Sequence, residues 1–114
     1  MKRGEVWLVN LDPTVGAEIK KTRPAVIVSH DALGKLPLRI IVPLTTWQEN
    51  FGQADWHIQV KASRSSGLDK TSSADTLQVR SVSETRLTKK LGALGAEEMA
   101  LIEAGLRLVL GMTP

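Results

Sequence analysis

The chain has 114 residues, a length that predicts one domain spanning 1–114. Its 42% hydrophobic and 24% charged residues are typical of globular proteins and argue against disorder. The absence of cysteine excludes a disulfide scaffold, thiol catalysis and thiolate zinc sites. A net charge of +3 permits a polyanionic partner without demanding one.

No apolar stretch approaches the roughly 20 residues that a membrane-spanning helix needs. The opening Met1-Lys2-Arg3-Gly4 is not followed by an apolar signal region. We therefore expect a cytoplasmic protein that makes no membrane contact.

The first third of the chain predicts two strands joined by a long basic loop. Apolar and β-branched residues predict a strand over about 4–11, which stops at the turn signal Asp12-Pro13, and a second strand over 24–29. The loop between them is longer than a tight hairpin needs, and loops of this length are usually functional or mobile.

The rest of the chain predicts further short strands and one terminal helix. The expected elements are strands over 38–44 and 56–60, a strand within 71–82 running through Gln78-Val79-Arg80, a helical turn over 83–86, a strand over 89–94, and a helix from 95 to Gly111. Pro43 indicates an edge position or the end of regular pairing. Met99, Ile102, Leu106 and Val109 form one apolar helix face. This pattern predicts a small, mostly antiparallel β-barrel or strongly bent sheet, capped by a helix.

Common enzyme motifs are missing. The sequence has no HExxH, no His/Cys ligand cluster, no phosphate-binding glycine loop and no GxSxG turn. Two histidines, His30 and His57, could serve as acid and base in RNA transesterification if they faced each other. Two histidines in a chain of this length are also compatible with no function.

Three cations crowd the end of the long loop, at Lys20, Lys21 and Arg23. Pro24 restricts the residue before it to extended geometry, so Arg23 should be held at the mouth of a strand. A guanidinium forks onto phosphate oxygens and stabilises charge that grows on phosphorus. A solvated basic loop is the alternative interpretation.

Two hydroxyls, Thr45 and Thr46, stand where the third strand ends. They are either strand and turn formers or, if the basic loop folds back over them, donors to the phosphate beside Arg23. Trp7 and Trp56 fit strand patterns and favour packing, whereas Trp47 follows the threonine pair and is the better candidate for base stacking.

Three stretches together resemble the MazF/PemK family of toxin endoribonucleases. The first consists of three segments near the N-terminus: Arg3 to Trp7, Leu11 to Glu18 and Thr22 to Ser29. The second is Val42-Pro43-Leu44-Thr45-Thr46, and the third is Leu77-Gln78-Val79-Arg80-Ser81-Val82. The terminal amphipathic helix fits as well, so the similarity spans nearly the whole chain in order.

The resemblance implies an SH3-like antiparallel barrel with a C-terminal helix that dimerises and needs no metal or other cofactor. Its implied activity is cleavage of single-stranded RNA, often mRNA, by 2′-OH attack to give a 2′,3′-cyclic phosphate. An antitoxin, expected to be acidic and partly disordered, would neutralise it. The candidate dimer surfaces are the strand Gln78–Val82 and the helix.

Catalysis in the family maps onto Arg23 and Thr45. The expected RNA-binding residues are Pro13, Thr14, Glu18, Lys20, Lys21, Thr46, Trp47 and Gln78.

Two departures from the family pattern bear on activity and base preference. Leu77 stands where the family commonly has an acid, so the role of that acid is absent or has moved to Asp75. The loop after Glu18 carries Ile19, Lys20 and Lys21 in place of glycines. Two rival hypotheses remain: a non-catalytic SH3-like binding module, like the CcdB gyrase poisons, and a degenerate toxin that binds RNA or antitoxin without cutting.

Overall fold

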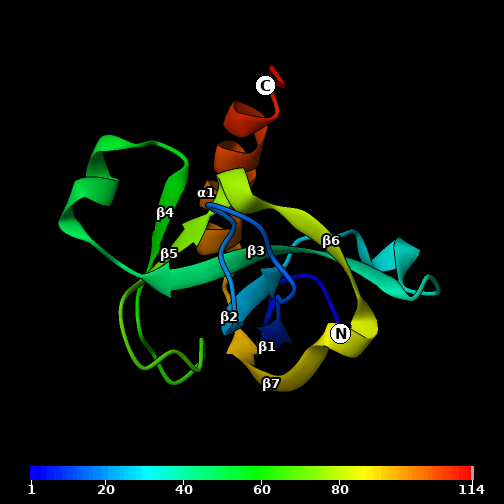
Figure 1. The fold of residues 1–114 in the computed structure, drawn as a ribbon. Helices are drawn as coiled ribbons and strands as arrows, with labels where there is room; N and C mark the ends of the chain where they lie inside the picture. The colour runs from blue at the N-terminus through cyan, green and yellow to red at the C-terminus, as the bar shows by residue number, and fades with distance from the viewer. Residues whose placement is uncertain (114) are drawn as a thin grey trace.

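The structure is a computed structural model that describes residues 1–113; residue 114, the last of the predicted domain 1–114, lies outside them. The described chain folds into short strands followed by one α-helix (Figure 1). The strands are β1 (Glu5–Asn10), β2 (Thr22–Ile27), β3 (Leu38–Thr46), β4 (His57–Val60), β5 (Ser72–Asp75), β6 (Arg80–Ser83) and β7 (Leu87–Ala93), and the helix is α1 (Ala96–Val109). Single 3-10 turns are η1 (Asp31–Leu33), η2 (Glu49–Gln53), η3 (Thr76–Gln78) and η4 (Glu84–Arg86). No helix within residues 1–113 is long and apolar enough to cross a bilayer.

The strands form one antiparallel sheet in the order β4-β5-β3-β2-β1-β7, with β6 paired to β3 off this path. The predicted antiparallel sheet with a C-terminal helix is therefore confirmed. The word barrel describes it loosely, because β4 and β7 end the strand order without pairing with each other. The molecule is a bent open sheet with α1 against one face (Figure 1).

Strand β3 organises the sheet. One side pairs with β2, while the other pairs first with β6 over 38–41 and then with β5 over 44–46. Pro43 falls at the switch between these two partners, where a residue without an N–H interrupts no ladder on that side. The prediction that pairing ends there is confirmed on that side, and the alternative of an edge strand is wrong.

The predicted strand through Gln78-Val79-Arg80 is also wrong, because the chain leaves β5 at Asp75 and makes the 3-10 turn η3 before β6. Thr76 is fully buried, and its hydroxyl donates to the Trp56 carbonyl at 2.7 Å. Gly105 of α1 approaches Thr76 so closely that a Cβ there would lie 2.9 Å from Thr76 Cγ2. The burial of Thr76 against α1 thus explains why residues 76–78 form a 3-10 turn although their sequence alternates like a strand.

The sheet carries a core on each face. Along β2 and just after it, Val26 and Val28 face the cluster that includes Met99 and Ile102 of α1, as the predicted helix face requires. The alternate residues Ala25 and Ile27 join the second cluster, which also contains Val9, Leu11, Ile41, Val82 and Leu87. Both faces of β2 are buried over residues 25–27, so packing fixes the part of the strand that directly follows Arg23 and Pro24.

Candidate active site

Arg23 and Thr45 are brought together by the pairing of β2 with β3. The last pair of this ladder is Ala25 with Pro43, and the same register continued by two residues places Arg23 opposite Thr45. Residues opposite each other in an antiparallel pair project to one face, with Cβ atoms roughly 5 Å apart. Both side chains are half-buried.

Two hollows adjoin this pair. The smaller, about 190 Å³, is lined by Arg23, Pro24, Leu44, Thr45, Thr46, Leu68, Asp69, Lys70 and Ser72, and we call it the Lys70 hollow. The larger, about 450 Å³, is lined by Ile19, Arg23, Thr45, Thr46, Gln48, Phe51, His57 and Asp75, and we call it the His57 hollow. Arg23, Thr45 and Thr46 line both, so one cation and two hydroxyls stand between the two spaces.

The guanidinium of Arg23 is held at one end. Its Nε donates to the carbonyl oxygen of Lys20 at 3.3 Å. Its two terminal nitrogens make no hydrogen bond to residues 1–113 and can donate to an anion. A guanidinium anchored in this way can donate two hydrogen bonds to the oxygens of one phosphate.

The loop between β1 and β2, residues 12–21, displays its predicted RNA-binding residues outward. Pro13, Lys20 and Lys21 are exposed. The Thr14 hydroxyl donates to Asp12 at 3.3 Å, and Glu18 accepts the amide of Val15 at 2.6 Å, so both side chains also stabilise the loop itself.

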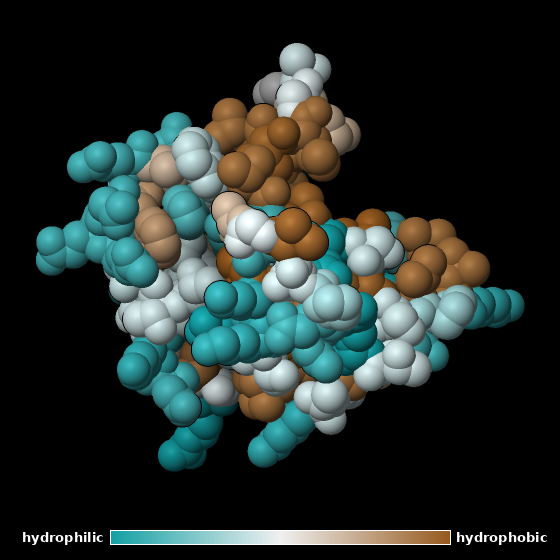
Figure 2. Space-filling view, viewed as in Figure 1, coloured by the Kyte–Doolittle hydropathy of each residue, from teal (hydrophilic) through white to brown (hydrophobic). Residues whose placement is uncertain are grey.

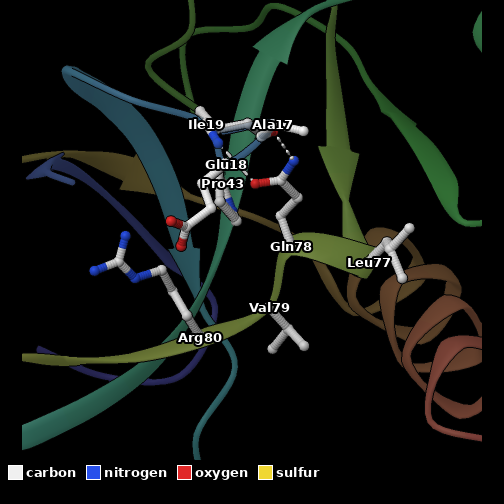
Figure 3. Close-up of a pocket in the computed structure, with 8 residues that line it drawn as sticks. All are labelled: Ala17, Glu18, Ile19, Pro43, Leu77, Gln78, Val79 and Arg80. Atoms are coloured by element: carbon white, nitrogen blue, oxygen red, sulfur yellow. Dashed lines mark hydrogen bonds between the residues drawn. The ribbon is translucent and has the colours of Figure 1, made fainter. Parts of the chain in front are cut away.

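The remaining predicted contacts are divided between the site and its surroundings. Thr46 is exposed and lines both hollows. Trp47 is half-buried, is absent from the lining of both hollows, and packs edge-on against Phe51 with ring centroids 5.7 Å apart. Gln78 lines a separate hollow of about 460 Å³, together with Ala17, Glu18 and Ile19 of the loop (Figure 3).

The structure adds Phe51 to the site and brings it together with His57 and Asp75, which sequence reasoning considered only for a histidine pair and for a displaced family acid. The ring of Phe51 stacks on His57 with centroids 3.9 Å apart and an interplanar angle of 5°. His57 Nδ1 is 2.8 Å from the Ser73 hydroxyl. Asp75 pairs with His57 across β4 and β5, and its Oδ1 is buried without a hydrogen-bond partner in the described chain. The β-strand pattern at 56–60 could have hinted at His57, but the convergence depends on strand pairing.

The two histidines do not meet. His30 follows β2 at the end opposite Arg23, and its Nδ1 accepts the amide of Ala32 at 3.0 Å to cap η1. His57 lies at the Arg23 end. The hypothesis of a facing histidine pair is therefore wrong.

Comparison with known proteins identifies the family of the chain. A family model described as PemK-like, MazF-like toxin of type II toxin-antitoxin system matches residues 2–110. The chain belongs to this toxin family. The relative named Endoribonuclease MazF9, from Mycobacterium tuberculosis, is 32% identical over 118 aligned residues, which cover 98% of each chain.

Solved structures share the toxin fold. The crystal structure of MazF from Deinococcus radiodurans has a TM-score of 0.82 at 22% identity, covering 98% of this chain and 97% of that one. A mycobacterial structure titled as an endoribonuclease in complex with its cognate antitoxin has a TM-score of 0.77 at 21% identity, covering 100% and 98% of the two chains.

One departure of this toxin from the family pattern has a structural counterpart. Leu77 is 59% exposed and lines neither hollow beside Arg23. Asp75, three residues before Gln78, does line the His57 hollow. Within residues 1–113, no three His, Cys, Asp or Glu side chains are grouped as a metal site would require.

Proposed function

We propose that this toxin domain is an endoribonuclease that cleaves single-stranded RNA, including mRNA, without a metal ion. The observation that carries the proposal is the shared lining of two adjoining hollows by Arg23 and Thr45. A binding module has no need to hold a guanidinium and a hydroxyl against the same small space. The names of its endoribonuclease relatives support the same activity.

The reaction uses a nucleophile that RNA itself carries. The ribose 2′-oxygen attacks the adjacent phosphorus, the bond from phosphorus to the 5′-oxygen breaks, and the proton of the 2′-OH is matched by one gained on the 5′-oxygen. The products are a 2′,3′-cyclic phosphate and a 5′-hydroxyl. Arg23 donates to the phosphorane as its negative charge grows, and Thr45 donates a hydrogen bond to the same phosphate.

The shape of the site suits an unstacked strand. With the scissile phosphate between Arg23 and Thr45, the flanking nucleotides fall into the Lys70 hollow and the His57 hollow. Attack requires the 2′-oxygen, phosphorus and leaving oxygen to align, which a stacked duplex resists. Exposed Lys20 and Lys21 supply the sequence-independent attraction to phosphates. The loop residues Pro13, Thr14 and Glu18, together with Thr46 and Trp47, remain candidates for contact with the rest of the strand.

The proposed partners follow from the family. A cognate antitoxin with an acidic, partly disordered segment would cover the cationic surface around Arg23. We also propose a homodimer built through β6 and α1, and action in the cytoplasm, where mRNA is available.

Cleavage of a defined single-stranded RNA in EDTA tests the function. We expect wild-type protein to produce fragments with 2′,3′-cyclic phosphate ends. A single 2′-deoxy substitution at a mapped cut site should abolish that cut and leave the others. RNA that binds but stays intact would support the non-catalytic module or the degenerate toxin instead.

A further inference from the structure

The side chain of Gln78 ties the β1–β2 loop to the body of the protein. Its Oε1 accepts the amide N–H of Ile19 at 2.7 Å, and its Nε2 donates to the carbonyl of Ala17 at 3.0 Å. Figure 3 shows the amide reaching from the end of η3 to the loop with both bonds drawn. One residue of a parallel strand makes the same two bonds to residues i and i+2 of its neighbour, so the side chain takes the place of a strand.

These two bonds hold the outer part of the loop. Every hydrogen bond within the described chain between residues 13–19 and the chain outside residues 12–21 comes from Gln78. The base of the loop is held separately, since the Leu11 amide donates to the Lys21 carbonyl at 2.9 Å and Arg80 donates to the Leu11 carbonyl at 3.1 Å.

The loop conformation includes a backbone angle that needs support. Lys21 has a φ of +71°, in the left-handed region. For a residue with a side chain this conformation is strained and persists only where the surroundings impose it. The Lys21 amide is held by Asp12 at 3.1 Å, but nothing at the base fixes residues 17–19.

The fixed segment leads directly to the catalytic cation. Ile19 is followed by Lys20, whose carbonyl accepts the Nε of Arg23 at 3.3 Å. Ile19 also lines the His57 hollow beside Arg23. A shift of residues 17–19 would therefore move both the acceptor that orients Arg23 and one wall of the hollow.

We propose that Gln78 is a positioning residue: by holding Ala17 and Ile19 it fixes the Lys20 carbonyl, and through it the direction of the Arg23 guanidinium. The inference rests on the proposed ribonuclease function. It assigns Gln78 a role through the loop instead of the direct RNA contact that its family motif suggested. Misplacement of a reacting group by about 1 Å can lower a rate about 100-fold.

The test compares Gln78→Leu with Gln59→Leu, the same chemical change at an exposed residue of β4. In the protein without RNA, Gln78→Leu should speed hydrogen exchange of the Ile19 amide about tenfold or more and move the NMR signal of Arg23 Nε–H. Gln59→Leu should change neither. Gln78→Glu keeps the acceptor and lacks the donor, so it should fall between wild type and Gln78→Leu, and it serves if the leucine variant does not fold.

The same variants then separate positioning from RNA contact. The single-turnover cleavage rate of Gln78→Leu should fall at least tenfold, while its affinity for a non-cleavable 2′-O-methyl RNA stays within about twofold of wild type. Weakened RNA affinity with an unchanged rate would overturn the proposal in favour of direct contact. Unchanged Ile19 and Arg23 signals in Gln78→Leu would overturn it even if the protein cleaves RNA. Absence of cleavage by wild-type protein would instead sink the proposed function.

Discussion

The carboxylate of Glu5 accepts hydrogen bonds from the Lys2 amide and the Trp7 indole, each at 3.0 Å, and lies 3.1 Å from the Lys90 ammonium. Burial alone would raise the pKa of this carboxyl, but these donors and the nearby N-terminus outweigh burial and hold the pKa at about 2. Since the ordinary pKa of this group is 4.5, the folded protein binds the Glu5 proton more weakly than the unfolded chain does. The folded state therefore favours the ionised form of Glu5, which links β1 to β7 through its ion pair with Lys90.

Replacing Glu5 with glutamine should make the free energy of unfolding less dependent on pH in the acidic range. The lowered pKa corresponds to about 3 kcal/mol, at about 1.4 kcal/mol per pH unit. This stabilisation is complete above pH 4.5 and is lost as the pH falls toward 2. Urea unfolding should show Glu5→Gln less stable than wild type by about 1–3 kcal/mol at pH 7 and nearly equal to it at pH 2.5. Glu49→Gln, at an exposed position, is the control, and a gap for Glu5→Gln that stays constant with pH would contradict the account.

Single residues of the site were predictable to different degrees. Arg23 and Thr45 stand in local motifs that resemble those of the family, so a role for each could be proposed before any fold was known. Phe51, His57 and Asp75 come from η2, β4 and β5, and they meet only because β5 pairs with both β3 and β4. No local spacing encodes that meeting. The family motif likewise marked Gln78 as important, but it did not indicate that the side-chain amide of Gln78 makes its hydrogen bonds to the β1–β2 loop.

At the scale of elements, apolar runs and alternation predicted most strands. Alternation failed at η3, where Thr76 is buried against Gly105 of α1 and its hydroxyl donates to the Trp56 carbonyl. Pro43 gave a correct signal of interrupted pairing and a wrong signal of an edge, because β3 changes partner on one side while staying paired on the other. The residue type thus predicted where backbone pairing is interrupted, but not which strands pair on either side of the interruption.

The turn Ser63 to Gly67 packs against β7 more tightly than any side chain permits. Gly67 has a φ of +72°, and a Cβ there would lie 2.1 Å from the Leu91 carbonyl oxygen. Gly92 meets the turn from the other side, where a Cβ would lie 2.2 Å from the Ser65 carbonyl oxygen. Glycine is required at both positions because two backbones touch there.

Alanine at Gly67 should therefore destabilise the fold by about 2–5 kcal/mol, from left-handed strain of about 1–2 kcal/mol and overpacking of about 1–3 kcal/mol. The matched change Gly52→Ala meets no atom within 4 Å and should alter stability by less than about 0.5 kcal/mol. Urea midpoints of the two variants give the comparison. Equal midpoints for the two variants would show that the turn accommodates a Cβ at residue 67 without loss of stability, and would contradict this prediction.

At the scale of the whole molecule, one apolar region of the surface lies over the C-terminal helix. Figure 2 shows apolar surface over the helix at the top and hydrophilic surface across the middle of this face. Leu101, Leu108 and Leu110 on and just after α1 are 53–60% exposed. Leu77, which directly precedes the predicted dimer strand Gln78–Val82, shares a hollow with Leu108 and Val109 of the helix region.

Charge placed in this apolar region should dissociate the proposed homodimer. Leu108 is 53% exposed in the single chain, and burying a glutamate there in a dimer would cost several kcal/mol unless the charge were paired. Light scattering after gel filtration should report a dimer for wild type and a monomer for Leu108→Glu. Leu36→Glu, at a leucine that is also 53% exposed but lies before β3, should remain dimeric. A monomeric wild type at high concentration would contradict the proposed assembly.

The central claim is that Arg23 and Thr45 bind one phosphodiester, and a double-mutant cycle on single-turnover RNA cleavage tests it most directly. Arg23→Ala should slow cleavage about 10²–10³-fold, as loss of one preorganised anion donor does. Thr45→Val, which keeps the shape and removes the hydroxyl, should slow it about 10–100-fold. Because both groups hold the same phosphate, the double variant should lose less than the product of the two factors. Cleavage by Arg23→Ala at near the wild-type rate, or fully multiplicative losses, would contradict the account.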